Sequence, residues 1–395
     1  MSGARTARGV TKRPELPAEL PGGRAAVAAV APPSRGRAVA LALLLSLGGL
    51  WGWALWREKQ VRPESTLLTV DAAPVRSLQF SPDGRVLLVS AVGPGRRGRA
   101  RGGVQIVYDI ERAEKDLPQV RAGAFGTVPL RRLRTVRVYR GEPEEMGVAA
   151  FSPGGGRFVT VSGQVGVWSA DTARVVRSFK AGRRAVAWMA DGRTLVWQND
   201  TGDLLTEDAE TGQVLSAFVP EPDSLVELAT TPDGATIAAR DRAGRVTLYG
   251  APTGVRRPVA QSPPALSLAV APDGRVALGA ADGTVRFCDA RTGTPVGVLA
   301  SPARPSAPVS ALAFAPDRRV PLLATGDASG RARVYTSPGG VGGAPATSGR
   351  ARTFVHSSGG ESRGVTALAI SPDGSRLATG GEDGRVHVWR LRPRQ

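Results

Sequence analysis

The sequence predicts an all-β fold, a seven-bladed β-propeller of four-stranded blades, preceded by one N-terminal transmembrane α-helix. Three observations lead to this prediction. A turn of the type Ser-Pro-Asp-Gly recurs seven times after residue 74. Most of these turns follow one another at roughly 40–45 residues, the length of a four-stranded propeller blade. A run of 19 uncharged residues precedes the first of them.

Composition restricts the possible functions. The net charge of +18 would suit a nucleic-acid partner. However, arginine is abundant together with Ala, Gly and Pro, as a GC-rich genome would produce, so we do not expect nucleic acid as a partner. The single cysteine, Cys288, permits no intramolecular disulfide, and two histidines cannot build a histidine-rich metal cage. We expect no metal and no cofactor.

The N-terminal part predicts a membrane anchor. Residues 1–37 lack periodicity and are expected to form a disordered basic tail. Residues 38–56 would span about 28 Å as a helix, close to the ~30 Å of a bilayer core. Three tryptophans crowd one end of this run, as they do at membrane interfaces. No small-residue cleavage site follows, so we expect an uncleaved signal anchor.

The basic tail is costly to move across a membrane, which predicts a cytoplasmic N-terminus and an extracytoplasmic propeller, periplasmic or extracellular in a bacterium. The expected organisation continues with a short linker at residues 57–65, the propeller at 66–391 and a tail at 392–395.

The recurring turn has a physical reason. Proline presets φ at the second position, and glycine takes the left-handed position that closes the turn. Each turn therefore predicts a hairpin between the first and second strands of a blade. Third strands follow, as at residues 285–289 and 385–389, and Thr-Gly pairs precede fourth strands at three places. The prolines of the repeat turns are Pro82, Pro153, Pro232, Pro272, Pro316 and Pro372.

The third strands carry a family resemblance. Val-His-Val-Trp ends at Trp389 and Val-Gly-Val-Trp ends at Trp168, while Tyr108, Cys288 and Tyr335 occupy the corresponding position in other units. These units resemble WD repeats, which implies a propeller that serves as a binding platform. The turn is also similar to that of Tol-type periplasmic propellers. No unit carries the family's Gly-His dipeptide, so we expect its buried His-Asp-Ser-Trp hydrogen-bond network to be missing.

Ring closure is predicted by the two ends of the repeat array. The last unit stops after its third strand, and residues 66–70 have the pattern of a fourth strand that would complete it. A linker of about eight residues reaches at most ~28 Å, so the propeller would lie close to the bilayer. The loops between third and fourth strands would then face the lipid.

Two arginine-rich insertions are candidate interaction sites. One insertion would lie on the membrane-distal face, and the other would form a membrane-proximal basic patch near anionic headgroups. The distal residues are Arg96, Arg97, Arg99 and Arg101, and the proximal residues are Arg131, Arg132 and Arg134.

The sequence shows no phosphate-binding loop and no paired-cysteine metal motif, and we expect Cys288, His356 and His387 to be structural. No catalytic residue is predicted, and we expect no enzymatic activity. The leading hypothesis is a membrane-anchored scaffold, monomeric, whose distal propeller face binds a protein or peptide. One alternative is an extracytoplasmic hydrolase or lyase with clustered Asp, Glu or His at the central channel. Another is a polyanion or lipid-headgroup binder that uses the arginine loops.

Overall fold

The computed structural model describes one unit of the chain, which lies within Gln60–Gln395. For residues 65–68, 92 and 103–109, only the backbone is described. The described ranges contain no helix that is long and apolar enough to cross a membrane. The predicted tail at 1–37, the anchor at 38–56 and the tail at 392–395 lie outside the described residues. The described ranges are 65–68, 74–92, 103–109, 148–161, 165–172, 174–179, 185–218, 225–260, 263–300, 306–336, 351–356 and 364–391.

These residues form antiparallel sheets, in which all strands except β1 pair with their neighbours in the sequence, and they contain no helix. The first sheet along the chain contains β2 (Val75–Phe80), β3 (Val86–Val92) and β4 (Gly103–Asp109). The second contains β5 (Val148–Phe151), β6 (Arg157–Val161), β7 (Val165–Ser169) and β8 (Val175–Phe179). The third contains β9 (Val186–Trp188), β10 (Thr194–Gln198), β11 (Leu204–Asp208) and β12 (Val214–Phe218). The next two are β13 (Leu225–Thr230), β14 (Thr236–Asp241), β15 (Val246–Gly250) and β16 (Arg256–Pro258); and β17 (Ala265–Val270), β18 (Arg275–Ala280), β19 (Val285–Asp289) and β20 (Pro295–Leu299).

The last two sheets close the series. One contains β21 (Val309–Phe314), β22 (Leu322–Asp327), β23 (Arg331–Thr336) and β24 (Ala351–Val355). The other contains β25 (Val365–Ile370), β26 (Arg376–Gly381), β27 (Arg385–Arg390) and β1 (Ser65–Leu68).

The expectation of seven four-stranded blades is wrong. Within the described ranges the propeller has six four-stranded blades, and β2, β3 and β4 form a three-stranded sheet. Residues 110–147, which follow β4 in the sequence, lie outside the described residues.

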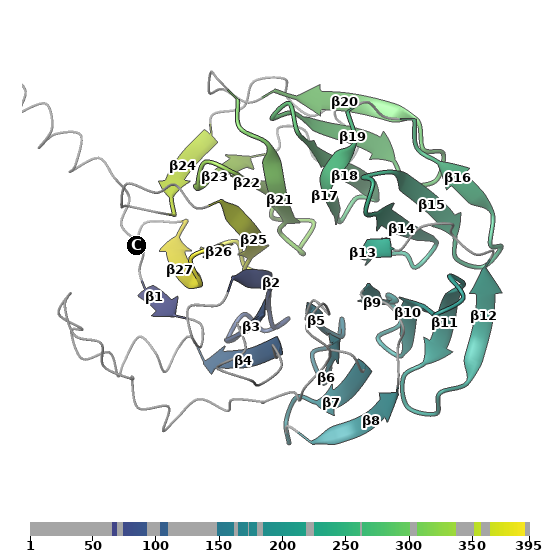
Figure 1. Ribbon diagram of the computed structural model, residues 1–395. Helices are drawn as coiled ribbons and strands as arrows, with labels where there is room; N and C mark the ends of the chain where they lie inside the picture. Colours follow the sequence, from purple (N-terminus) through teal and green to yellow (C-terminus); the bar gives the residue numbers. More distant parts are fainter. Residues whose placement is uncertain are drawn as a thin grey trace, which may run out of the picture. The chain divides into compact units, whose positions relative to one another are not determined.

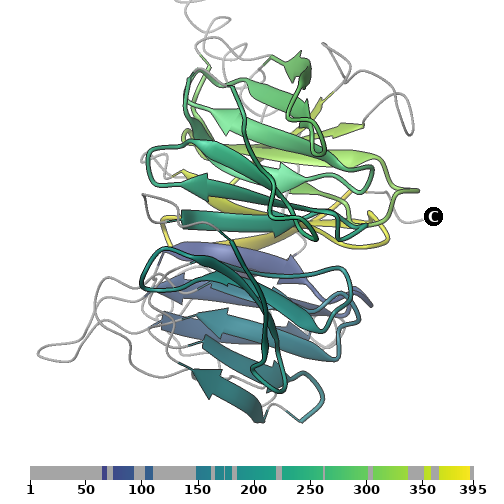
Figure 2. The ribbon, with the colours of Figure 1, turned by 90° about the vertical axis from the view of Figure 1, so that its right-hand side faces the viewer.

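The sheets stand around a central axis, each with its first strand innermost (Figure 1). The inner strands β2, β5, β9, β13, β17, β21 and β25 contact one another in cyclic order, including β25 with β2. Seen from the side, the strands run across the thickness of the ring (Figure 2).

The predicted closing strand is confirmed. β1 pairs antiparallel with β27, and Thr66 lies opposite His387. The strand begins at Ser65, one residue before the expected boundary. The last blade therefore combines segments from both ends of the array, which covers the edge of β27 that would otherwise be open.

The core lies between neighbouring sheets. Val75, Phe80 and Val89 pack against Ala369 and Val388 of the last blade, and all are buried. Such clusters recur around the ring because alternate side chains of each strand point to opposite faces, and each sheet is covered on both faces.

The repeat turns join neighbouring sheets as well as strands. Gly155 has a φ of 74°, and a Cβ placed there would lie 3.1 Å from Cδ of Pro82 in the preceding sheet. The position of Gly84 faces Pro372 in the same way, at 3.5 Å. At these two junctions the proline of one turn therefore occupies the space that the glycine of the next turn leaves free.

Candidate functional site: the central channel

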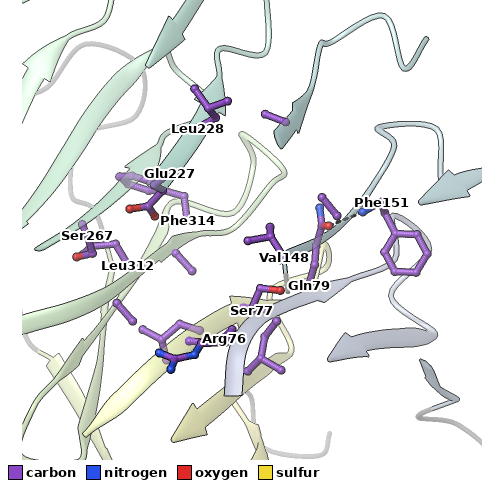
Figure 3. Close-up of a pocket in the computed structure, with 18 of the residues that line it drawn as sticks. Arg76, Ser77, Gln79, Val148, Phe151, Glu227, Leu228, Ser267, Leu312 and Phe314 are labelled. Atoms are coloured by element: carbon purple, nitrogen blue, oxygen red, sulfur yellow. Dashed lines mark hydrogen bonds between the residues drawn. The ribbon is translucent and has the colours of Figure 1, made fainter. Parts of the chain in front are cut away.

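The inner strands enclose a cavity of about 1140 Å³ along the axis of the ring. All seven inner strands contribute to its wall (Figure 3). Most of the wall is apolar, as at Val148, Leu228, Leu312 and Phe314. A concave apolar surface with few polar groups is typical of a binding site.

Five of the inner strands contain a β-bulge at the same end. In each, the pairing register with the second strand skips one residue, which is left without a cross-strand partner. A bulge redirects the side chain that it carries. All five residues line the cavity. The bulged residues are Arg76, Val226, Leu266, Ser310 and Thr366.

Two of these bulges bond to the next sheet. Ser310 Oγ donates to the carbonyl oxygen of Val365 at 2.5 Å, and Thr366 Oγ1 donates to that of Val75 at 2.7 Å. In contrast, Leu266 is 40% exposed and Arg76 is exposed. We call the channel end lined by Arg76, Val226, Arg242 and Leu266 the arginine mouth; Arg242 belongs to the turn between β14 and β15.

Other polar side chains of the wall hold neighbouring inner strands together. Ser77 Oγ accepts from the N–H of Ala149 at 3.2 Å. Gln79 Oε1 accepts from the N–H of Phe151 at 2.6 Å (Figure 3). Ser267 Oγ donates to the Val309 carbonyl at 3.1 Å. These polar groups therefore form hydrogen bonds that stabilise the ring.

Glu227 has a similar structural role between β13 and β17. Its carboxylate accepts from Arg240 Nε at 2.8 Å and from the N–H of Leu268. Burial raises the pKa of Glu227, and the Arg240 guanidinium opposes that rise. The carboxylates of the described channel wall are Glu227 and Asp317, and the described wall contains no histidine. Asp317 accepts from the N–H of Arg319 in a turn at the opposite end.

That opposite end is formed by the repeat turns. Pro82, Pro153, Pro316 and Pro372 line it, and we call it the proline mouth. Pro232 and Pro272 lie in the equivalent turns of two other blades. Because strands alternate in direction, turns between third and fourth strands lie on the same face as the proline mouth.

The prediction that the His-Asp-Ser-Trp network is missing is wrong for the last blade. Trp389 Nε1 donates to Thr379 Oγ1 at 2.9 Å, and Nδ1 of His356 lies 2.8 Å from the same oxygen. His356 Nε2 lies 3.3 Å from Asp383 Oδ1. His356 follows β24 of the preceding blade, and the residue before it is valine instead of glycine. A search for the Gly-His dipeptide therefore does not find it.

The other third-strand positions are packed in different ways. Trp168 Nε1 donates to Thr160 Oγ1 at 2.9 Å, and Tyr335 is buried. Cys288 is 2% exposed, and burial raises the pKa of its thiol to about 12. The thiol therefore stays protonated at neutral pH. Tyr108 lies in β4, opposite Leu87 of β3.

Histidine, cysteine and acidic side chains of the described ranges form no group of three that could hold a metal ion. The predicted interaction residues of the two insertions lie outside the described residues, namely Arg96, Arg97, Arg99, Arg101, Arg131, Arg132 and Arg134.

Sequence reasoning missed Arg76, Arg242 and Leu266. All three residues lie at one end of the channel. Arg76 and Leu266 lie there because of β-bulges, which depend on the pairing register of two strands and cannot be recognised in the sequence of a single repeat unit.

Comparison with known proteins agrees with this architecture. The family described as "WD domain, G-beta repeat" matches residues 352–390, the segment that holds His356, Thr379, Asp383 and Trp389. No curated protein matches the sequence. Among solved structures, a chain in the crystal structure of the mitotic checkpoint complex is similar, with a TM-score of 0.62. The two chains share 14% identity over 85% of this chain and 96% of that chain, so the likeness shows the fold alone. The matched repeat and the similar structure together support a WD-repeat β-propeller.

Proposed function

We propose that this chain is a membrane-anchored WD-repeat scaffold that binds a protein or peptide partner at the arginine mouth of its propeller. The observation that carries the proposal is the exposed Leu266, which lies at a bulge and lines, with Arg76 and Arg242, the same end of a cavity of about 1140 Å³. Arginine is enriched at protein interfaces, and the largest contributions to binding come from well-packed, desolvated pockets.

The test is affinity purification of the full chain from membranes of the organism that makes it. Leu266→Glu places a charge in the mouth. Val214→Glu makes the same change at β12, where Val214 is 51% exposed on an outer strand. We expect a protein that co-purifies with the wild type and with Val214→Glu but is lost with Leu266→Glu. Equal recovery with both variants would refute binding at the mouth.

The proposal includes an orientation in which residues 38–56 cross the membrane, the N-terminus is cytoplasmic and the propeller is extracytoplasmic. β1 is antiparallel to β27, so Ser65 lies opposite Val388, towards the face of the proline mouth. The short linker before β1 would hold that face near the lipid and turn the arginine mouth away from it. An alkaline phosphatase fused after Gln395 should be active in a bacterial host, whereas activity of only a cytoplasmic reporter there would contradict the orientation.

A further inference from the structure

We infer that the partner segment bound at the arginine mouth is an acidic peptide with apolar residues, which offers carboxylates to Arg76 and Arg242 and an apolar side chain to Leu266 and Val226. The inference rests on the proposed function and specifies the chemistry of its partner.

The charge at the mouth is only partly balanced by the protein. Arg240 is paired with Glu227 at 2.8 Å, and Arg245 is paired with Asp241 at 2.6 Å. These nearby acidic groups are therefore already used. Arg76 and Arg242 are exposed, and neither forms an ion pair within the described part of the chain. Two cations at the end of a concave apolar surface attract an anion and bind a carboxylate through charge-assisted hydrogen bonds.

The apolar part of the mouth favours a peptide over nucleic acid. Single-stranded nucleic acids bind to basic grooves through aromatic side chains on which the bases stack. The five bulged positions carry arginine, valine, leucine, serine and threonine. Leu266 is 40% exposed and Val226 is half-buried, so both can contact an aliphatic side chain of a ligand.

The length of the channel suits an extended segment. The inner strands β2, β13, β17, β21 and β25 have six residues each. Six residues of a strand span about 20 Å, so an extended peptide of roughly six residues would run the same distance. An alternating sequence of acidic and apolar residues is a suitable probe.

The experiment measures fluorescence anisotropy with the purified full chain. The probe is a labelled octapeptide of alternating Glu and Leu, compared with octapeptides of alternating Gln and Leu and of alternating Glu and Ser. We expect the double variant Arg76→Gln/Arg242→Gln to raise the Kd of the Glu–Leu peptide at least about tenfold, the loss typical of a charge-assisted hydrogen bond. The Kd of the Gln–Leu peptide should not change in this variant.

Two further variants separate the contributions. Leu266→Ser should weaken both leucine-containing peptides. Arg174→Gln, at an exposed position just before the outer strand β8, should change neither. The thermal midpoint of the Arg76→Gln/Arg242→Gln variant should equal that of the wild type, because neither side chain has a structural partner among the described residues.

Several results would overturn the inference. The first is equal affinity of the wild type for the Glu–Leu and Gln–Leu peptides. The second is a loss of affinity for the Glu–Leu peptide in Arg174→Gln that equals the loss in the double variant. The third is a thymidine octanucleotide that binds more tightly than the Glu–Leu peptide and loses affinity in the double variant. If the Leu266-sensitive partner were still captured in any of these cases, the proposed scaffold function would stand and only the acidic chemistry would be wrong. If no such partner were captured either, both would fail.

Discussion

At the scale of single residues, the best-defined polar group is the buried network of the last blade. Thr379 Oγ1 accepts from Trp389 Nε1 and contacts Nδ1 of His356. Its side chain thus joins the third strand of one blade to the segment that follows the preceding blade. Because Trp389 is 1% exposed and His356 is 2% exposed, water cannot replace the hydroxyl.

Thr379→Val keeps the volume of the side chain and removes that hydroxyl. A buried donor without an acceptor costs roughly 1–3 kcal/mol, so we expect the free energy of unfolding to fall by about 2–3 kcal/mol. Urea unfolding followed by circular dichroism measures the change. Thr353→Val, at an exposed position of the outer strand β24, is the matched control and should be neutral. A similar loss in both variants would contradict a special role for the network.

His387 makes stability depend on pH. Burial lowers the pKa of His387 to about 4, with the neighbouring His356 as the next cause, and Asp383 opposes the shift. In the unfolded chain a histidine has a pKa near 6.5, so between pH 4 and pH 6.5 the unfolded chain binds more protons than the folded chain. The free energy of unfolding should therefore rise by up to about 3 kcal/mol from pH 4 to pH 6.5. Above pH 6.5 the protonation of His387 should no longer change it.

Urea unfolding at pH 4.5, 5.5, 6.5 and 7.5 should show this rise in the wild type and a flatter profile in His387→Gln. Asp383, whose pKa is about 2 because hydrogen bonds from His356 and the Arg385 N–H outweigh the effect of burial, acts in a lower pH window. An unchanged slope in His387→Gln would rule out His387 as the cause.

At the scale of elements, the turns were predictable and the bulges were not. The Pro-Asp-Gly turns follow from local chemistry, and Gly84, Gly234 and Gly374 have the positive φ that such turns require. The bulges at Arg76 and Leu266 depend instead on how two strands pair, so the arginine mouth could not be found in the sequence. His356 was missed for the related reason that its partners Thr379 and Asp383 lie in the next blade.

Adjacent glycines offer a direct test of the turn geometry. Gly155 has a φ of 74° and faces Pro82, whereas a Cβ at Gly154 would have no atom within 4 Å. Gly155→Ala should cost about 1–2 kcal/mol, because an L-residue is strained at positive φ. Gly154→Ala should be neutral or slightly stabilising. The difference between their thermal midpoints is the measurement, and equal midpoints would refute the packing described here.

The closing strand can be tested by matched deletions. Removal of residues 1–70 takes away β1, while removal of residues 1–60 leaves its pairing with β27 intact. We expect the shorter chain to unfold at a lower temperature and to self-associate in size-exclusion chromatography, because the edge of β27 is then open. Identical behaviour of the two chains would show that β1 does not hold the ring closed.

At the scale of the whole molecule, the ring follows from the repetition of one unit, and the function proposed for it rests on the channel that the ring surrounds. The repeat spacing and the closing strand were enough to predict a propeller. The number of four-stranded blades was overestimated, because the first unit contains three strands within the described ranges. The channel ends differ in chemistry, because prolines line one end and two arginines and an exposed leucine line the other.

The most direct test of partner binding at the arginine mouth is site-specific photo-crosslinking in intact cells. A photoreactive amino acid is placed at position 266 in the mouth and, in a separate variant, at position 214 on the outer strand β12. We expect a discrete protein adduct from position 266, identifiable by mass spectrometry, and none from position 214. Adducts from position 214 alone would contradict binding at the mouth.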